Sequence, residues 1–117
     1  MKNPDLFDEA KALACYGNPA ILEQVLGEFL GQTDSMLVQL RQAVEKGNRD
    51  EIRKAVHWFR GGMSYLFSPA TERICQTLDA QSTPDPVMPM EDTLNALQDV
   101  LQRLRDHFQL HAPRDGN

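Results

Sequence analysis

Apolar residues recur along much of the chain at three- and four-residue spacing, which is the period of an amphipathic helix. In the segment 19–46 they are Leu22, Val25, Phe29, Met36, Leu40 and Val44. In the segment 90–110 they are Leu94, Leu97, Leu101, Leu104 and Phe108. No segment shows the strict alternation that is typical of a half-buried strand. The pattern therefore predicts an all-α protein.

Capping residues divide this helical pattern into separate elements. Asn18-Pro19 and Ser68-Pro69 each place a good N-cap residue before a proline, which fits the first turn of a helix. Gly47 is suited to end the helix that precedes it. Asn48, followed three residues later by Glu51, predicts a capping box at the start of the next helix.

These boundaries predict a single domain over residues 1–117. The expected helices lie near 5–15, 19–46, 49–67, 69–80 and 90–110, with a proline-containing loop at 81–89. Each long helix has one apolar face, and such faces are buried against one another. We therefore expect an antiparallel up-down four-helix bundle with a short N-terminal helix covering one end.

Composition narrows the classes of partner. The 117 residues carry a net charge of −5 with a pI near 5.1, which argues against nucleic-acid binding. Cys15 and Cys75 are far apart, so we expect reduced thiols rather than a disulfide or zinc site. No apolar run approaches the roughly 20 residues of a membrane span, and the start lacks a secretory signal. We expect a cytoplasmic monomer without direct membrane contact, or the cytoplasmic end of a membrane-anchored protein.

The helix expected at 49–67 presents a histidine to water. Its apolar stripe lies within about 60° of one direction at roughly 100° per residue. The residues of that stripe are Ile52, Ala55, Val56, Phe59, Met63 and Leu66. His57 lies roughly 140° from this direction and is therefore predicted to be exposed. Gly61, one turn later, costs about 1 kcal/mol relative to alanine in a helix, but it leaves the imidazole open to an approaching protein.

Neutral imidazole is a nucleophile at cellular pH, and phosphohistidine would carry close to two negative charges. Arg60 is placed to offer paired donors to that phosphate, and Arg53 and Lys54 add positive potential. The chain has no GxxxxGK[ST] loop, no glycine-rich nucleotide lid and no carboxylate cluster for Mg²⁺. These features predict a protein that accepts and passes on phosphate without binding ATP or a cofactor.

Other polar and aromatic residues leave alternatives open. His107 and His111 have the i, i+4 spacing of two metal ligands, but no further ligand is apparent, so we expect solvated residues and no metal. Trp58 and Tyr65 lie off the apolar stripe. They either form part of a partner-binding surface or cover neighbouring helices.

The run His57-Trp58-Phe59-Arg60-Gly61, followed by Leu66 and by Ile74-Cys75-Gln76-Thr77-Leu78-Asp79, resembles the histidine-containing phosphotransfer (HPt) domain. The similarity covers about residues 5–80. The family resemblance implies a four-helix bundle that takes a phosphoryl group from a receiver-domain aspartate and donates it to another receiver. Partners would be receiver domains of response regulators and of a hybrid sensor kinase, with Mg²⁺ supplied by the receiver.

By position, the resemblance makes His57 the phosphoacceptor, Arg60 the basic residue and Gly61 the small residue beside it. It also places Gly62 and Ser64 near the docking surface. The presence of Pro69 and Tyr65 resembles the pattern of HPt domains at the C-termini of tripartite hybrid sensor kinases, which implies that the chain is such a domain.

Two positions depart from the family pattern, which commonly has lysine at Arg60 and glycine at Phe67. Trp58, Tyr65 and Phe67 add bulk around the expected docking face. A competing hypothesis is therefore a helical adaptor that binds a receiver or kinase without accepting phosphate.

Overall fold

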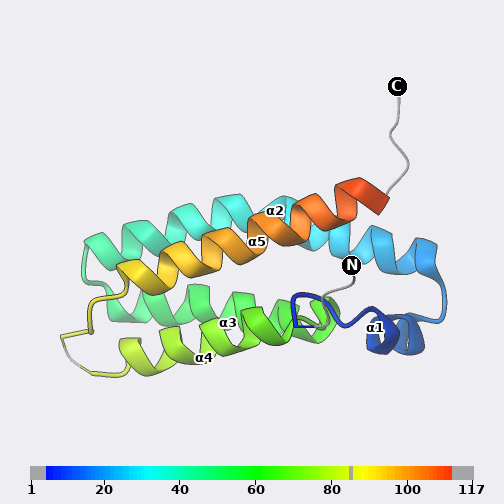
Figure 1. Ribbon diagram of the computed structural model, residues 1–117. Helices are drawn as coiled ribbons and strands as arrows, with labels where there is room; N and C mark the ends of the chain where they lie inside the picture. The colour runs from blue at the N-terminus through cyan, green and yellow to red at the C-terminus, as the bar shows by residue number, and fades with distance from the viewer. Residues whose placement is uncertain (1–4, 85, 112–117) are drawn as a thin grey trace.

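The computed structural model describes residues 5–84 and 86–111, apart from the side chains of 63–66 and 108–111. Its elements are α1 (Glu9–Tyr16), α2 (Pro19–Glu45), α3 (Arg49–Leu66), α4 (Pro69–Ser82) and α5 (Glu91–His111). In Figure 1, α2 lies beside α5, and α3 lies beside α4. Contacts run in a closed ring from α2 through α3, α4 and α5 back to α2, so the predicted four-helix bundle is confirmed.

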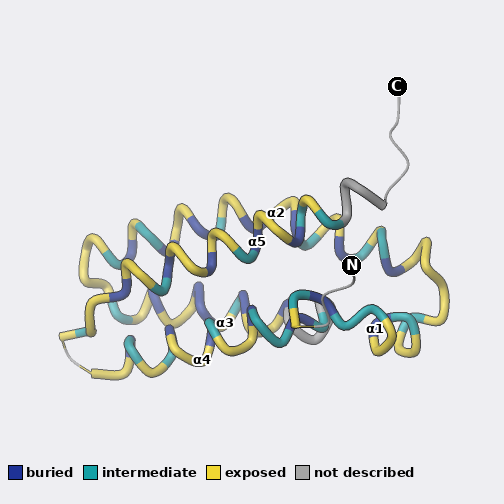
Figure 2. Tube along the Cα trace, viewed as in Figure 1, coloured by how far each residue is buried: buried dark blue, intermediate teal, exposed yellow. Residues whose placement is uncertain are grey.

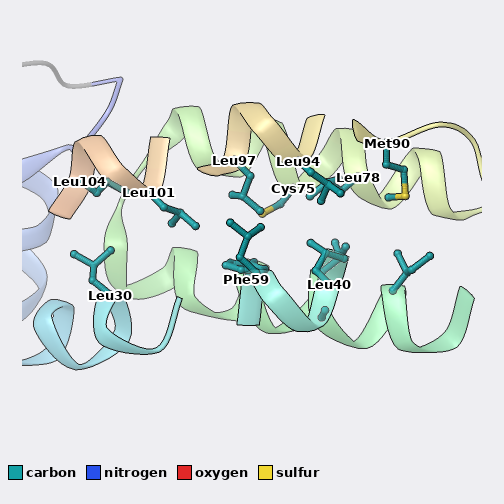
Figure 3. Packing of buried hydrophobic residues seen from close by; sticks show 14 of the residues in the cluster. Leu30, Leu40, Phe59, Cys75, Leu78, Met90, Leu94, Leu97, Leu101 and Leu104 are labelled. Atoms are coloured by element: carbon teal, nitrogen blue, oxygen red, sulfur yellow. The ribbon is translucent and has the colours of Figure 1, made fainter. Parts of the chain in front are cut away.

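The core occupies the centre of this ring. Figure 2 shows buried positions recurring along the inner sides of the four long helices. In Figure 3, labelled side chains from all four of these helices point toward the same interior. The largest of them is Phe59 of α3, which has no exposed surface. Among the described residues, no helix has both the length and the apolar character of a membrane span.

Capping residues explain why the helices begin and end where they do. Asn18 Oδ1 accepts a hydrogen bond from the Ala20 amide at 2.8 Å, and Ser68 Oγ accepts one from the Thr71 amide at 3.3 Å. Gly47 has a φ of 64°, a left-handed conformation that ends α2 as predicted.

Only half of the predicted capping box forms at the start of α3. Asn48 Oδ1 accepts from the Glu51 amide at 3.2 Å, as expected. The Asn48 amide, however, donates to the Ala43 carbonyl at 3.0 Å, which completes the end of α2. Glu51 instead lies 3.7 Å from Lys54 Nζ, on the outer side of the helix.

The expected helix at 5–15 is wrong in its first turn. Asp8 is the N-cap of α1, and its carboxylate accepts from the Lys11 amide at 3.1 Å. Asp5 precedes the helix and pairs with Arg73 of α4 through two hydrogen bonds of 2.7 and 2.8 Å. This pairing holds the pKa of the Asp5 carboxyl below its usual value, chiefly through the hydrogen bonds from Arg73. The segment before α1 is therefore held against α4 by the Asp5–Arg73 ion pair.

Phe67 links α3 to α4 in the left-handed conformation, with a φ of 51°. A non-glycine residue there carries a strain on the order of 1 kcal/mol or more. The Phe67 carbonyl accepts from the Asp8 amide at 2.7 Å, and its ring meets Tyr16 edge-on at 6.4 Å. The backbone thus adopts the glycine-like turn, and contacts with the N-terminal segment offset the strain.

A polar contact fixes α5 against α2 near one end of the bundle. Arg105 Nη1 donates to Thr33 Oγ1 at 2.9 Å, and Thr33 in turn donates to the Leu30 carbonyl at 2.7 Å. The same guanidinium lies 3.0 Å from Asp34. Thr33 is fully buried, and these two bonds satisfy its hydroxyl.

Candidate functional site

His57 lies on the outer face of α3, and its predicted exposure is confirmed. Its neighbours Val56 and Phe59, on the inner face of the same helix, are buried in the core at 1% and 0% exposure. The burial of these two side chains fixes the rotation of α3 about its axis, since turning the helix would bury polar groups instead. A rigid helix therefore holds the imidazole toward solvent. Within the described part of the chain, no hydrogen bond or ion pair engages the ring.

A polar hollow of about 560 Å³ opens beside His57. Its lining residues are Asp50, Arg53, Lys54, Val56, His57, Arg60 and Asp79. The three cations that we predicted around His57 are thus brought together with it. Three cations against the two carboxylates of the same lining leave a small excess of positive charge in an otherwise acidic protein, which favours an anionic group at this place.

Two carboxylates also face this hollow, and sequence reasoning did not assign either of them a role. Asp79 belongs to α4, and its Oδ2 lies 3.6 Å from Arg60 Nη1. Both side chains are close to half exposed, at 40% and 47%. Asp50 lies two turns before His57 on α3, so its helical spacing was an available signal. The proximity of Asp79 depends on the packing of α4 against α3 and has no such local signal.

Gly61 and Gly62 occupy different environments despite being neighbours. A Cβ added to Gly61 would meet open space, which agrees with the predicted clearance beside His57. Gly62 is buried, and an added Cβ would overlap the ring of Phe29. Its expected place on the docking surface is therefore wrong. Gly62 lies about 70° from the middle of the apolar stripe, and this angle was the signal that it faces α2.

Trp58 packs on α2. Its ring stacks on Phe29 with centroids 4.7 Å apart and planes 13° from parallel, and it meets Phe59 edge-on at 5.1 Å. Of the two interpretations of Trp58, covering a neighbouring helix is the one that the contacts favour. The side chains of Ser64 and Tyr65, which we expected near the docking surface, lie outside the described residues, as do those of Met63 and Leu66.

The two glycines predict opposite effects on stability. Gly61→Ala should raise the free energy of unfolding by up to about 1 kcal/mol because alanine is the better helix former and the site is open. Gly62→Ala should lower it by about 1–3 kcal/mol because the methyl group displaces the Phe29 ring from Trp58. Urea unfolding followed by tryptophan fluorescence and circular dichroism measures both. Equal effects of the same sign would contradict this assignment.

Cys75 lies in the core and does not contribute a reactive thiol. It is fully buried on α4, and burial raises its pKa to about 12, although the nearby Arg60 acts in the opposite direction. The thiol is therefore protonated at neutral pH and behaves as a small apolar side chain, as predicted.

The described residues contain no group of three or more potential metal ligands. His107 is half-buried and packs against the ring of Phe7 with centroids 5.6 Å apart. The side chain of His111, its potential partner in the alternative metal hypothesis, is outside the described residues.

Comparison with known proteins gives one family and one similar structure. The family model for the Hpt domain matches residues 24–107. The crystal structure of the HPT domain from an Hpt sensor hybrid histidine kinase of Shewanella superimposes with a TM-score of 0.76 at 17% sequence identity. The match covers 92% of this chain and 94% of the other. A search of curated proteins found no match.

Proposed function

Because this chain belongs to the Hpt domain family, whose members are phosphotransfer intermediates of two-component phosphorelays and not kinases, we propose that His57 is the residue that carries the phosphoryl group. The observation that supports this assignment is the exposed imidazole beside a hollow that also gathers Arg53, Lys54 and Arg60. The other histidine with a described side chain, His107, is half-buried and packs against the ring of Phe7.

In the proposed reaction, a lone pair on a neutral ring nitrogen of His57 attacks the phosphorus of an aspartyl phosphate on a receiver. The new N–P bond forms as the P–O bond to the aspartate breaks, and the electron pair of that bond leaves with the carboxylate. The other ring nitrogen keeps its proton, so the imidazole gains one positive charge and the released aspartate carries the negative charge. Donation to a second receiver reverses these steps.

The neighbouring cations have distinct tasks. The Arg60 guanidinium is planar and can direct two N–H groups at a pair of phosphate oxygens. Lys54 is an exposed point charge, with 76% of its side chain in solvent, and it adds potential without fixed geometry. Transfer demands chiefly positioning and charge neutralisation, which a helix packed on both sides can supply.

We propose that the partners are receiver domains of response regulators and of a hybrid sensor kinase, and that the receiver supplies the Mg²⁺. Hpt domains interact with receiver domains as a class. The open space at Gly61 lets a receiver place its aspartyl phosphate alongside His57. The proposal also places the domain in the cytoplasm, where receiver domains act, as a monomer that docks one receiver at a time.

The proposed function is tested by incubating the protein with receiver domains phosphorylated by a kinase, in the presence of Mg²⁺. We expect at least one receiver of the source organism to transfer its label, giving a protein-bound phosphate that is lost in acid and kept in base. Receivers that bind the domain without transferring label, across the full set, would instead support the adaptor hypothesis.

Arg60→Ala should slow transfer by about 10- to 100-fold, because a hydrogen bond to a charged group contributes about 1.5–3 kcal/mol. The side chain is half exposed, so the bundle should remain folded. Rapid-quench kinetics with one labelled receiver measure the rate, and Arg103→Ala on α5 is a control that also removes an exposed arginine from an ion pair. Equal rates in the two variants would contradict the role of Arg60.

A further inference from the structure

The ion pair between α3 and α4 involves the same guanidinium that the proposed function assigns to phosphate. Arg60 Nη1 lies 3.6 Å from Asp79 Oδ2, and Asp79 lines the hollow together with His57. A guanidinium cannot align the same donors with a carboxylate and with a phosphate at once. At 3.6 Å the contact with Asp79 is an ion pair through one nitrogen, so a phosphate on His57 that draws the guanidinium toward itself lengthens and weakens this pair.

From this geometry we infer that Asp79 competes with the phosphoryl group for Arg60 and so sets how strongly the domain retains phosphate. The inference depends on the proposed function of His57. In the unphosphorylated domain, Asp79 stabilises Arg60 by pairing with it. In the phosphorylated domain, Asp79 loses at least part of that pairing and lies near a group of its own charge. Both effects disfavour the phosphorylated state relative to the unphosphorylated one.

A relay intermediate benefits from this balance. If Arg60 bound the phosphate without competition, the phosphorylated domain would be more stable and donation to the next receiver would be less favourable. Asp79 makes the phosphoryl group easier to pass on, at the cost of a less favourable uptake. The magnitude should be small because both side chains are close to half exposed and water screens their interaction.

Asp79→Asn tests the inference because it removes the charge and keeps the shape of the side chain. The equilibrium constant for transfer from a labelled receiver to His57 should rise by about two- to fivefold. Asp50→Asn is the matched control, since Asp50 lines the same hollow, has the same charge and has no ion pair with Arg60 within the described residues. Its effect should be smaller than that of Asp79→Asn.

A double-mutant cycle separates competition for Arg60 from simple repulsion. In the Arg60→Ala background, Asp79→Asn should raise the equilibrium constant no more than Asp50→Asn does, because the contested cation is gone. An equally large effect of Asp79→Asn with and without Arg60 would overturn the inference, as would equal effects of the two asparagine variants. Circular dichroism of each variant checks that the bundle is intact.

A binding measurement tests Asp79 independently of phosphotransfer. Inorganic phosphate can be titrated into the isotopically labelled protein while the Nε–Hε signal of Arg60 is followed by NMR. Asp79→Asn should lower the dissociation constant by about two- to fivefold relative to wild type, and Asp50→Asn should lower it less. An unchanged constant would overturn the competition. Failure of His57 to take label from any receiver would instead refute the proposed function and leave this titration valid.

Discussion

Replacing His57 with glutamine is expected to reduce phosphoryl uptake from receivers by on the order of 1000-fold or more, to background, because the substitution removes the attacking nitrogen. His57 is exposed and makes no described hydrogen bond, so the free energy of unfolding should change by less than about 0.5 kcal/mol. Transfer from a labelled receiver measures the first effect, and urea unfolding measures the second.

The matched control is His107→Gln, which makes the same chemical change on α5. His107 is half-buried against Phe7, so this variant should lose some stability and keep phosphotransfer. Persistent labelling of the His57→Gln protein, or loss of labelling in the His107→Gln protein while it remains folded, would contradict the assignment of His57.

Phe59→Ala should have the largest effect on stability, lowering the free energy of unfolding by about 3–5 kcal/mol. Phe59 has no exposed surface and lies in the core shared by the four long helices (Figure 3), so its removal leaves a cavity as well as losing buried apolar area. Domains of this size are stable by about 5–15 kcal/mol in total, so the variant should be close to unfolding.

Urea unfolding followed by circular dichroism measures the loss, with Ile21→Ala on α2 as the control. Ile21 is 48% exposed, and its truncation should cost much less than that of Phe59. Similar losses in the two variants would show that Phe59 does not occupy the centre of the core. Because α3 carries His57 on its other face, partial unfolding of Phe59→Ala should also reduce phosphoryl uptake in proportion to the unfolded fraction.

The four long helices were predictable because their signals are local. Apolar spacing identifies α2 and α5, and caps such as Asn18 and Ser68 mark starts that the structure confirms. The segment before α1 was not predictable in the same way. Its conformation depends on the contact between Asp5 and Arg73, which are separated by 68 residues and meet only when the bundle has formed.

The candidate site likewise combines features that a local sequence signal predicts with features that depend on the packing of distant segments. The exposure of His57 follows from its angle on a single helix, and the cations on α3 follow with it. Asp79 reaches the site from α4, so its pairing with Arg60 depends on how two helices pack. Phe67 occupies a turn where the family commonly has glycine, and the resemblance alone could not show that this residue keeps a left-handed backbone. The contacts with Asp8 and Tyr16 that offset its strain come from the N-terminal segment.

The most direct test of the account is to locate the phosphoryl group. The wild-type domain is incubated with an active, phosphorylated receiver, and the product is digested at basic pH and sequenced by mass spectrometry with a fragmentation method that preserves N–P bonds. We expect the phosphoryl mass on His57 and on no other residue. A phosphoryl group found on a different side chain, with His57 unmodified, would contradict the central claim.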